Sequence, residues 1–390
     1  MENSEALSAI AFFGAIALAS FLPVVIRFVL VPAVVLEILF GVVLGPQFLG
    51  IVQPGPLLES LSELGLAVLF FMAGFEVEPS EIGGRPLRLA MRTWVLSLGI
   101  ALAFAYGAYA LGALPAPGYV ALAISTTAIG ALMPMLRDNE LLSPPYGPHA
   151  LANGSIGEGL PLVMLSLLLA GYAGFGAQAL ILVGFTLAAV AAIVLADRYG
   201  EKGLAPILRK TMHHSGQFPL RFALFLTVAF VFLGEHFGLD LVLGAFVAGA
   251  VARAAMPADL REQLNSKLDG IGYGFLIPCF FVFSGLTLDI AALIESPMAL
   301  IAIPIFAAVM LVVRGAPVLL YDKDLSASER QALALHNGTQ LPLVVAITAI
   351  AVEAGAMPTW LAASMVAAGV LTVLVYPALG VRLLRARSAG

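Results

Sequence analysis

The chain has 390 residues, 61% of them hydrophobic and 11% charged, and its mean hydropathy is +1.02. This composition is too apolar for a soluble protein, and the small net charge of −5 gives no sign of a nucleic-acid partner. A single cysteine, Cys279, excludes a disulfide framework and a cysteine-based metal site.

Apolar segments long enough to span a bilayer follow one another along the whole sequence. Polar breaks divide the chain into about 13 segments of about 20 residues, which predicts an all-α polytopic membrane protein. The predicted segments are 6–23, 29–45, 59–75, 92–111, 117–136, 148–171, 177–196, 218–234, 239–253, 268–286, 298–320, 328–353 and 359–381.

The basic residues predict the orientation of the chain in the membrane. All 19 Lys and Arg residues fall in the loops after every second segment, beginning with the first, in the segment ends beside those loops, and in the C-terminal tail. The opposite loops carry only acidic residues, such as Glu59 and Asp240. Because cytoplasmic loops are enriched in Lys and Arg, we expect a multi-pass protein of the inner (plasma) membrane with its N-terminus outside and its C-terminus in the cytoplasm.

The two halves of the chain resemble each other. Residues 1–196 and 218–390 form two predicted membrane halves joined by a cytoplasmic linker, 197–217, and we expect no soluble regulatory domain in this chain. The pair Phe70-Phe71 recurs as Phe280-Phe281, and Ser125–Ala128 pairs with Asn337–Gln340, at an offset of about 210 residues. An odd number of segments separates the partners, so the second copy is inverted, which is typical of secondary transporters.

Two segments that match each other in the repeat carry polar residues, and these make an unbroken membrane helix unfavourable. Ser125-Thr126-Thr127 is followed by Gly130 and Pro134, and the run from His336 through Asn337, Thr339 and Gln340 ends at Pro342. An unsatisfied polar group in the membrane costs several kcal/mol. We therefore expect two interrupted helices, one per repeat, whose ends meet and whose hydroxyl and amide groups bind an ion; ordinary interhelical hydrogen bonds and proline kinks are the alternative.

Glu158 is the main candidate for a functional carboxylate. It lies near the middle of segment 148–171 among three glycines, with Asn153 and Ser155 as possible co-ligands. Burial favours the protonated form of a carboxyl group and a bound cation favours the charged form, so one group can exchange the two. A structural, protonated Glu158 is the alternative, and Glu37, in segment 29–45, is a secondary candidate.

No Lys or Arg is expected at mid-membrane. The nearest is Arg314, towards the cytoplasmic end of segment 298–320, and we interpret it as an interfacial anchor. If Glu158 acts alone, one cation is exchanged for one proton and transport is electroneutral. His336 is a second pH-sensitive candidate, with a structural role as the alternative.

These residues resemble the cation:proton antiporter-2 family, the Kef-type K⁺/H⁺ exchangers and related Na⁺/H⁺ exchangers. The motifs are Phe40–Pro46, Leu69–Glu76, Leu122–Ile129, Gly244–Gly249 and Pro278–Asp289. The resemblance implies an inverted-repeat Na⁺/H⁺ antiporter-like fold with two crossed broken helices, usually in a homodimer. It places predicted segments 4–6 and 11–13 in the core, and segments 1–3 and 8–10 in a scaffold.

The chain departs from the family pattern at the carboxylate. The family usually has an Asp five residues before an Ile-Pro; aligned on Pro161, that position is Ile156, and the carboxylate is Glu158, two residues later. The Arg-Gly-Glu type sequence of many relatives is replaced by Thr339-Gln340-Leu341-Pro342, and the cytosolic nucleotide-binding domain of Kef proteins is absent from this sequence.

The sequence therefore predicts a secondary transporter that exchanges K⁺ or Na⁺ for protons by alternating access, with Glu158 as the shared carboxylate. We expect no enzyme activity and no cofactor besides the transported ions, and the expected partners are the lipid bilayer, a second copy in a homodimer and a possible separate regulatory subunit. The alternatives are a Na⁺-coupled organic anion symporter, which the lack of a mid-membrane cation disfavours, and an ion-binding channel-like or sensor protein.

Overall fold

The described part of the chain is all-helical, as predicted. The structure, a computed structural model, describes residues 2–25, 32–76, 84–172, 205–236 and 241–388, with single positions between 184 and 195. In these ranges, 7 helical spans are long and apolar enough to cross a membrane, and shorter apolar helices cover Ala33–Leu44, Phe218–Gly234 and Leu241–Ala255. Most of predicted segment 177–196 and linker residues 197–204 lie outside the described residues, as does Arg27.

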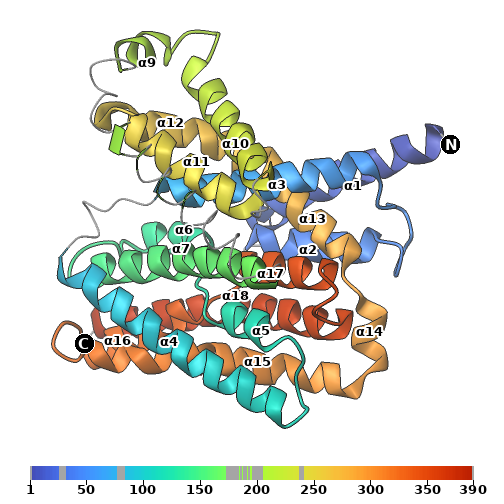
Figure 1. Cartoon of the computed structure of the whole chain (residues 1–390), viewed down its shortest axis with the longest axis vertical. Helices are drawn as coiled ribbons and strands as arrows, with labels where there is room; N and C mark the ends of the chain where they lie inside the picture. Colours follow the sequence, from blue (N-terminus) through green and yellow to red (C-terminus); the bar gives the residue numbers. More distant parts are fainter. Residues whose placement is uncertain are drawn as a thin grey trace. The chain divides into compact units, whose positions relative to one another are not determined.

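The chain divides into two compact units. Unit 1 comprises Met1–Pro54, Glu78–Pro161 and Val282–Gly390, and α15, α16 and α18 lie side by side within it (Figure 1). Its elements are α1 (Glu2–Val25), α2 (Ala33–Leu44), α4 (Arg85–Ala110), α5 (Pro117–Ile124), α6 (Ile129–Asp138), α14 (Ile290–Glu295), α15 (Pro297–Gly315), η2 (Ala316–Tyr321), α16 (Ala327–Asn337), α17 (Pro342–Glu353) and α18 (Thr359–Ser388).

Unit 2 comprises Gly55–Val77 and Leu162–Phe281. Its elements are α3 (Pro56–Glu76), α9 (Ala205–Thr211), α10 (Phe218–His236), α11 (Leu241–Ala255), α12 (Ala258–Ile271) and the π-helical turn η1 (Gly272–Leu276). The helices α7 (Tyr146–Tyr172) and α13 (Ile277–Thr287) each contribute residues to both units. The helix α9 lies within the predicted linker.

The grouping of helices differs from the expected one at α1 and α2. The resemblance predicts that the first three segments belong to a scaffold, whereas α1 and α2 belong to unit 1 with the predicted core segments. A reason lies in α2, where the backbone at Gly41 approaches the backbone of α13: a Cβ atom at Gly41 would lie 2.1 Å from the carbonyl oxygen of Val282 and 2.9 Å from Cα of Gly285.

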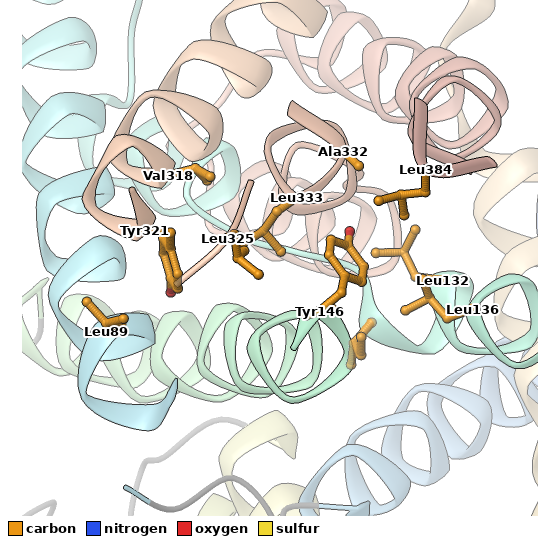
Figure 2. Close-up of a cluster of buried hydrophobic side chains, with 12 residues drawn as sticks. Leu89, Leu132, Leu136, Tyr146, Val318, Tyr321, Leu325, Ala332, Leu333 and Leu384 are labelled. Carbon is orange, nitrogen blue, oxygen red and sulfur yellow. The ribbon is translucent and has the colours of Figure 1, made fainter. Parts of the chain in front are cut away.

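An apolar cluster joins the helices of unit 1 that are far apart in the sequence (Figure 2). Helices α4, α6, α7, α16 and α18, with η2 and the residue Leu325 after it, contribute to this cluster. Its buried members are Leu89, Ile129, Leu132, Leu136, Tyr146, Ala150, Val318, Tyr321, Leu325, Ala332, Leu333 and Leu384. The cluster therefore fixes one half of each predicted broken helix, α6 and α16, against the long helix α7.

We predict that Gly41→Ala lowers the stability of the protein by about 2 kcal/mol or more, because backbone atoms at the contact cannot move aside as a side chain can. The matched control is Gly99→Ala in α4, where nothing lies within 4 Å of the added Cβ atom. Thermal unfolding of both variants in detergent measures the effect. Equal melting temperatures for the two variants would contradict this packing.

Candidate functional site

Both predicted broken helices are interrupted, and their interruptions meet. The first lies between Ile124, where α5 ends, and Ile129, where α6 begins; the second lies between Asn337 and Pro342, the ends of α16 and α17. We call residues 125–128 and 338–341 the crossing. The prediction of two broken helices is confirmed.

Hydrogen bonds between the two interrupted segments satisfy backbone groups that the breaks leave without a helical partner. The Ala128 amide donates to the Thr339 carbonyl at 2.9 Å. The Thr127 hydroxyl donates to the Asn337 carbonyl at 2.8 Å, and the Gln340 side-chain amide donates to the Ile124 carbonyl at 3.0 Å. Each segment therefore supplies partners for the other, which allows both helices to stay broken in an apolar interior.

Local side-chain bonds favour the breaks themselves. The hydroxyl groups of Ser125 and Thr126 donate to the carbonyls of Leu122 and Ala123, three residues earlier, at 2.8 and 2.9 Å. Side chains that bond nearby carbonyl groups compete with the helical pattern. In the second segment, Pro342 lacks a backbone N–H and can begin α17 at no hydrogen-bonding cost.

Four helix ends point at the crossing. The C-terminal ends of α5 and α16 bring partial negative charge, and the N-terminal ends of α6 and α17 bring partial positive charge. The hydroxyl of Thr126 lies 3.4 Å from the Gln340 side-chain oxygen, and both residues are buried. The crossing therefore offers oxygen atoms and oppositely signed dipole ends within a small buried volume.

Glu158 extends from α7 to the start of α6. Its Oε1 atom lies 3.5 Å from the Gly130 amide nitrogen in the first turn of α6, and its side chain is half-buried. A helix N-terminus favours a negatively charged group. The position aligned with the family Asp, Ile156, instead packs with Ala90 and Ala152 in an apolar cluster. A shift of two residues, about 200° around the helix, accounts for this difference.

Arg314 lies at the crossing, and its interpretation as an interfacial anchor is wrong. The residue is only 1% exposed. Its Nε donates to the Thr127 hydroxyl at 2.9 Å, and its terminal nitrogens donate to the Ser97 hydroxyl and the Asn153 carbonyl, both at 3.3 Å. These partners are neutral oxygens. Its guanidinium is thus held inside the protein by α4, α7 and the crossing, which its place in the apolar segment did not indicate.

Gly157 gives the guanidinium room to approach α7. A Cβ atom at this position would lie 2.8 Å from Nη2 of Arg314 and 2.7 Å from Cβ of Thr127. The Thr127 amide also donates to the Gly157 carbonyl at 3.0 Å. The glycine next to Glu158 therefore serves close packing of α7 on the crossing and on Arg314.

Asn153 connects α7 to three other elements. Its amide nitrogen donates to the His149 carbonyl at 2.8 Å and to the Tyr321 hydroxyl at 2.7 Å. Its side-chain oxygen accepts from Thr93 at 3.2 Å and from the Asn337 side chain at 3.4 Å. Both hydrogens and both lone pairs of the amide group are thus used, and Asn153 positions the crossing in this arrangement.

Four predicted site residues remain: Thr339, Ser155, His336 and Glu37. Thr339, which follows α16, donates its hydroxyl to the Leu335 carbonyl of that helix at 3.1 Å. The half-buried Ser155 is two residues beyond Asn153 and so on the opposite side of α7. His336 is buried and bonded to the Tyr146 hydroxyl at 2.5 Å, and Glu37 is buried on α2. The His336 carbonyl accepts from the Thr339 amide at 3.2 Å, but no side-chain hydrogen bond among the described residues joins His336 or Glu37 to the crossing.

Sequence reasoning missed Ser97, Thr93, Tyr321 and Thr372. The first two lie four residues apart on α4, and therefore on one helix face, which is the signal that could have indicated them. Thr372 of α18 donates to the Gln340 carbonyl and accepts from the Gln340 amide, both at 3.0 Å. Within the described residues there is no group of three or more His, Cys, Asp or Glu side chains that could hold a metal ion.

Comparisons with known proteins match nearly the whole chain. Residues 14–386 match the family described as "Sodium/hydrogen exchanger, transmembrane". YjbQ of Bacillus subtilis (strain 168), named for Na⁺/H⁺ antiport, is 27% identical over 362 residues, which are 89% of this chain and 58% of YjbQ. The glutathione-regulated potassium-efflux system protein KefC of Escherichia coli (strain UTI89 / UPEC) is 26% identical over 368 residues, 88% of this chain and 55% of KefC.

A solved structure shares the fold. The sodium proton antiporter MjNhaP1 from Methanocaldococcus jannaschii at pH 8 matches with a TM-score of 0.60 at 18% identity, over 99% of this chain and 97% of that chain. The predicted antiporter-like fold with crossed broken helices is confirmed. The chain spans little more than half the length of its relatives YjbQ and KefC.

We predict that Thr127→Val destabilises the protein by about 1–3 kcal/mol, because it leaves the Arg314 Nε hydrogen and the Asn337 carbonyl without their partner. Thr287→Val is the control, since this exposed hydroxyl bonds only carbonyls of its own helix. Melting temperatures in detergent give the comparison. A Thr127→Val protein as stable as the control would show that these two bonds are not needed.

Proposed function

The chain belongs to the sodium/hydrogen exchanger family, and we propose that it exchanges a monovalent cation, Na⁺ or K⁺, for protons at the crossing by alternating access. The family and the relatives support cation/proton antiport at the level of the class. The choice between the two ions is left open by the relatives, because YjbQ is named for Na⁺/H⁺ antiport and KefC for potassium efflux.

The observation that carries the proposal is the placement of Glu158 at the start of α6. The half-buried carboxylate is 3.5 Å from the Gly130 amide nitrogen, beside the break of the first interrupted helix. The positive end of α6 and a bound cation both favour the charged carboxylate, whereas exclusion of water favours the protonated one. Glu158 therefore binds a cation or a proton, and the competition between them couples the two fluxes.

The oxygen atoms of the crossing supply the other ligands in this proposal. The Thr126 hydroxyl uses its hydrogen within the protein and keeps a lone pair for a cation. The carbonyl groups at the ends of α5 and α16, and the side-chain oxygen of Gln340, add acceptors of the kind that alkali cations prefer. Thr127, Asn153, Asn337 and Thr339 hold the two segments in place, and Ser155 remains a candidate ligand.

Arg314 keeps its charge throughout the proposed cycle, because a guanidinium group does not lose its proton in proteins. The charge that changes is then that of Glu158 alone, which is neutralised either by one proton or by one cation. The proposed exchange is therefore one for one and electroneutral.

The position of Arg314 also supports a second candidate, the Na⁺-coupled organic anion symporter. The lack of a cation inside the membrane was the argument against it, and Arg314 supplies one beside the crossing. Each of its three nitrogens already donates a hydrogen bond to a protein oxygen. These bonds, which use three of the five N–H donors, favour a structural guanidinium over one that receives a carboxylate solute, so cation/proton exchange stays the first proposal.

The assembly and orientation are also proposals. The resemblance supports a homodimer, and the alternating distribution of Lys and Arg supports a plasma-membrane protein with a cytoplasmic C-terminus. Because KefC is much longer than the matched region, a separate regulatory chain remains a proposed partner.

We predict that wild-type protein in liposomes dissipates an imposed pH gradient when Na⁺ or K⁺ is added, and that Glu158→Gln slows this by about 100-fold or more. Glu262→Gln, on the exposed face of α12, is the control and keeps the wild-type rate. Exchange that persists in Glu158→Gln would contradict the carboxylate's role.

Two further arms of the same assay separate the alternatives. An imposed membrane potential should leave the rate unchanged, and a clear dependence would contradict one-for-one exchange. Uptake of a small carboxylate with Na⁺, without proton movement, would instead support the symporter.

A further inference from the structure

One residue of the second interrupted segment is held by a side chain of α18. The Thr372 hydroxyl accepts from the Gln340 backbone amide and donates to the Gln340 backbone carbonyl, both at 3.0 Å. It also lies 2.8 Å from the Gly369 carbonyl, so its single hydrogen is shared between two acceptors. Both Thr372 and Gln340 are fully buried. A single side chain therefore supplies a partner for each backbone group of Gln340, where α16 has ended and α17 has not begun.

The surface of α18 fits the backbone of this segment. Gly369 lies three residues before Thr372 and therefore on the same face of the helix. A Cβ atom at Gly369 would lie 2.8 Å from the Gln340 carbonyl oxygen and 3.2 Å from Cδ1 of Leu341. The missing side chain lets the backbone of α18 approach closely enough for the Thr372 hydroxyl to reach both backbone groups. Gly369 and Thr372 thus form one contact with the crossing, which we call the α18 contact.

The side chain of Gln340 is held from the other interrupted segment. Its amide nitrogen donates to the Ile124 carbonyl at 3.0 Å, and its oxygen lies 3.4 Å from the Thr126 hydroxyl. These two side-chain oxygens are acceptors of the proposed cation site. Because the Gln340 side chain starts from a backbone that Thr372 holds, the α18 contact and the Ile124 carbonyl together determine where the Gln340 oxygen lies.

We propose that Thr372 is a positioning residue of the cation site, which sets cation affinity by fixing the backbone of Gln340 and with it the Gln340 side-chain oxygen. The proposal rests on the proposed antiport function and adds a determinant of ion binding outside the two interrupted helices. Thr372 acts through Gln340 and is not itself a ligand. Its effect is pre-organisation: the oxygens are in place before the ion arrives, so little conformational freedom is lost on binding.

Removal of the Thr372 hydroxyl has a defined consequence at the site. Without it, the N–H and C=O groups of Gln340 lack these partners in an apolar interior, which is unfavourable. Rotation of the peptide towards other partners relieves this, and the Gln340 side-chain oxygen then moves relative to Thr126. The two oxygens have to be brought together again each time a cation binds, which weakens binding.

The chain offers a matched control in the same helix. Ser364 of α18 is also fully buried, and its hydroxyl donates to the carbonyls of Ala299 and Trp360, at 3.1 and 2.7 Å. Ser364→Ala and Thr372→Val each remove one buried hydroxyl from α18, but only the second removes a partner of the crossing. Thr372→Ser keeps the hydroxyl and is the conservative variant that should restore binding.

The test measures binding of Na⁺ and of K⁺ to the purified full chain by isothermal titration calorimetry, with melting temperatures recorded beside it. For the ion that wild type binds more tightly, we expect Kd to rise about fivefold or more in Thr372→Val. We expect Kd to stay within about twofold of wild type in Thr372→Ser and Ser364→Ala. A purely structural hydroxyl would lower the melting temperature of Thr372→Val and leave Kd unchanged, and that result would overturn the proposal.

Gly369→Ala provides a second variant, which keeps every polar group and displaces the Gln340 carbonyl instead. We expect it to raise Kd as Thr372→Val does, whereas Gly99→Ala, with open space around the added Cβ atom, should not. A wild-type Kd in Gly369→Ala would overturn the role of the α18 contact.

The same titrations separate this proposal from the antiport proposal. Equal affinities in wild type and Thr372→Val would overturn the positioning role alone. Absence of Na⁺ and K⁺ binding in wild type would overturn both proposals together.

Discussion

The structure of unit 1 depends on satisfying the backbone groups that two broken helices leave open inside an apolar protein. An unpaired N–H or C=O group in such surroundings costs several kcal/mol. The Ala128–Thr339 bond and the Thr127–Asn337 bond meet this requirement from both segments at once. Each break thus supplies hydrogen-bond partners for the other, which is a physical reason for the two to lie together.

The same requirement explains the many polar residues around the crossing. Asn153 and Gln340 use their amide groups to connect the crossing to α4, α7 and α18, and Arg314 adds a fixed positive charge with neutral partners. Such a network is rigid because each member holds several others. Glu158 is half-buried beside the start of α6, with its carboxylate 3.5 Å from the Gly130 amide nitrogen.

Much of this arrangement is predictable from the sequence, because helix breaks have local causes. Ser125 and Thr126 donate to carbonyls three residues earlier, and Thr127 donates to the partner segment. Pro342 cannot continue a helix, so both breaks could be located from residue types alone. The burial of Arg314 could not, because its partners Asn153, Thr127 and Ser97 lie 161, 187 and 217 residues away in the sequence. The role of Asn153 was also beyond prediction, since its partners Thr93 and Tyr321 lie 60 and 168 residues away in the sequence.

The measurement that tests the central claim most directly is proton release on cation binding. Purified protein in a weakly buffered detergent solution is titrated with Na⁺ or K⁺, and the released protons are counted against the cations bound. Competition at a single carboxylate predicts about one proton per cation, with release absent in Glu158→Gln. Cation binding without proton release, or equal release from Glu158→Gln, would contradict a shared site at Glu158.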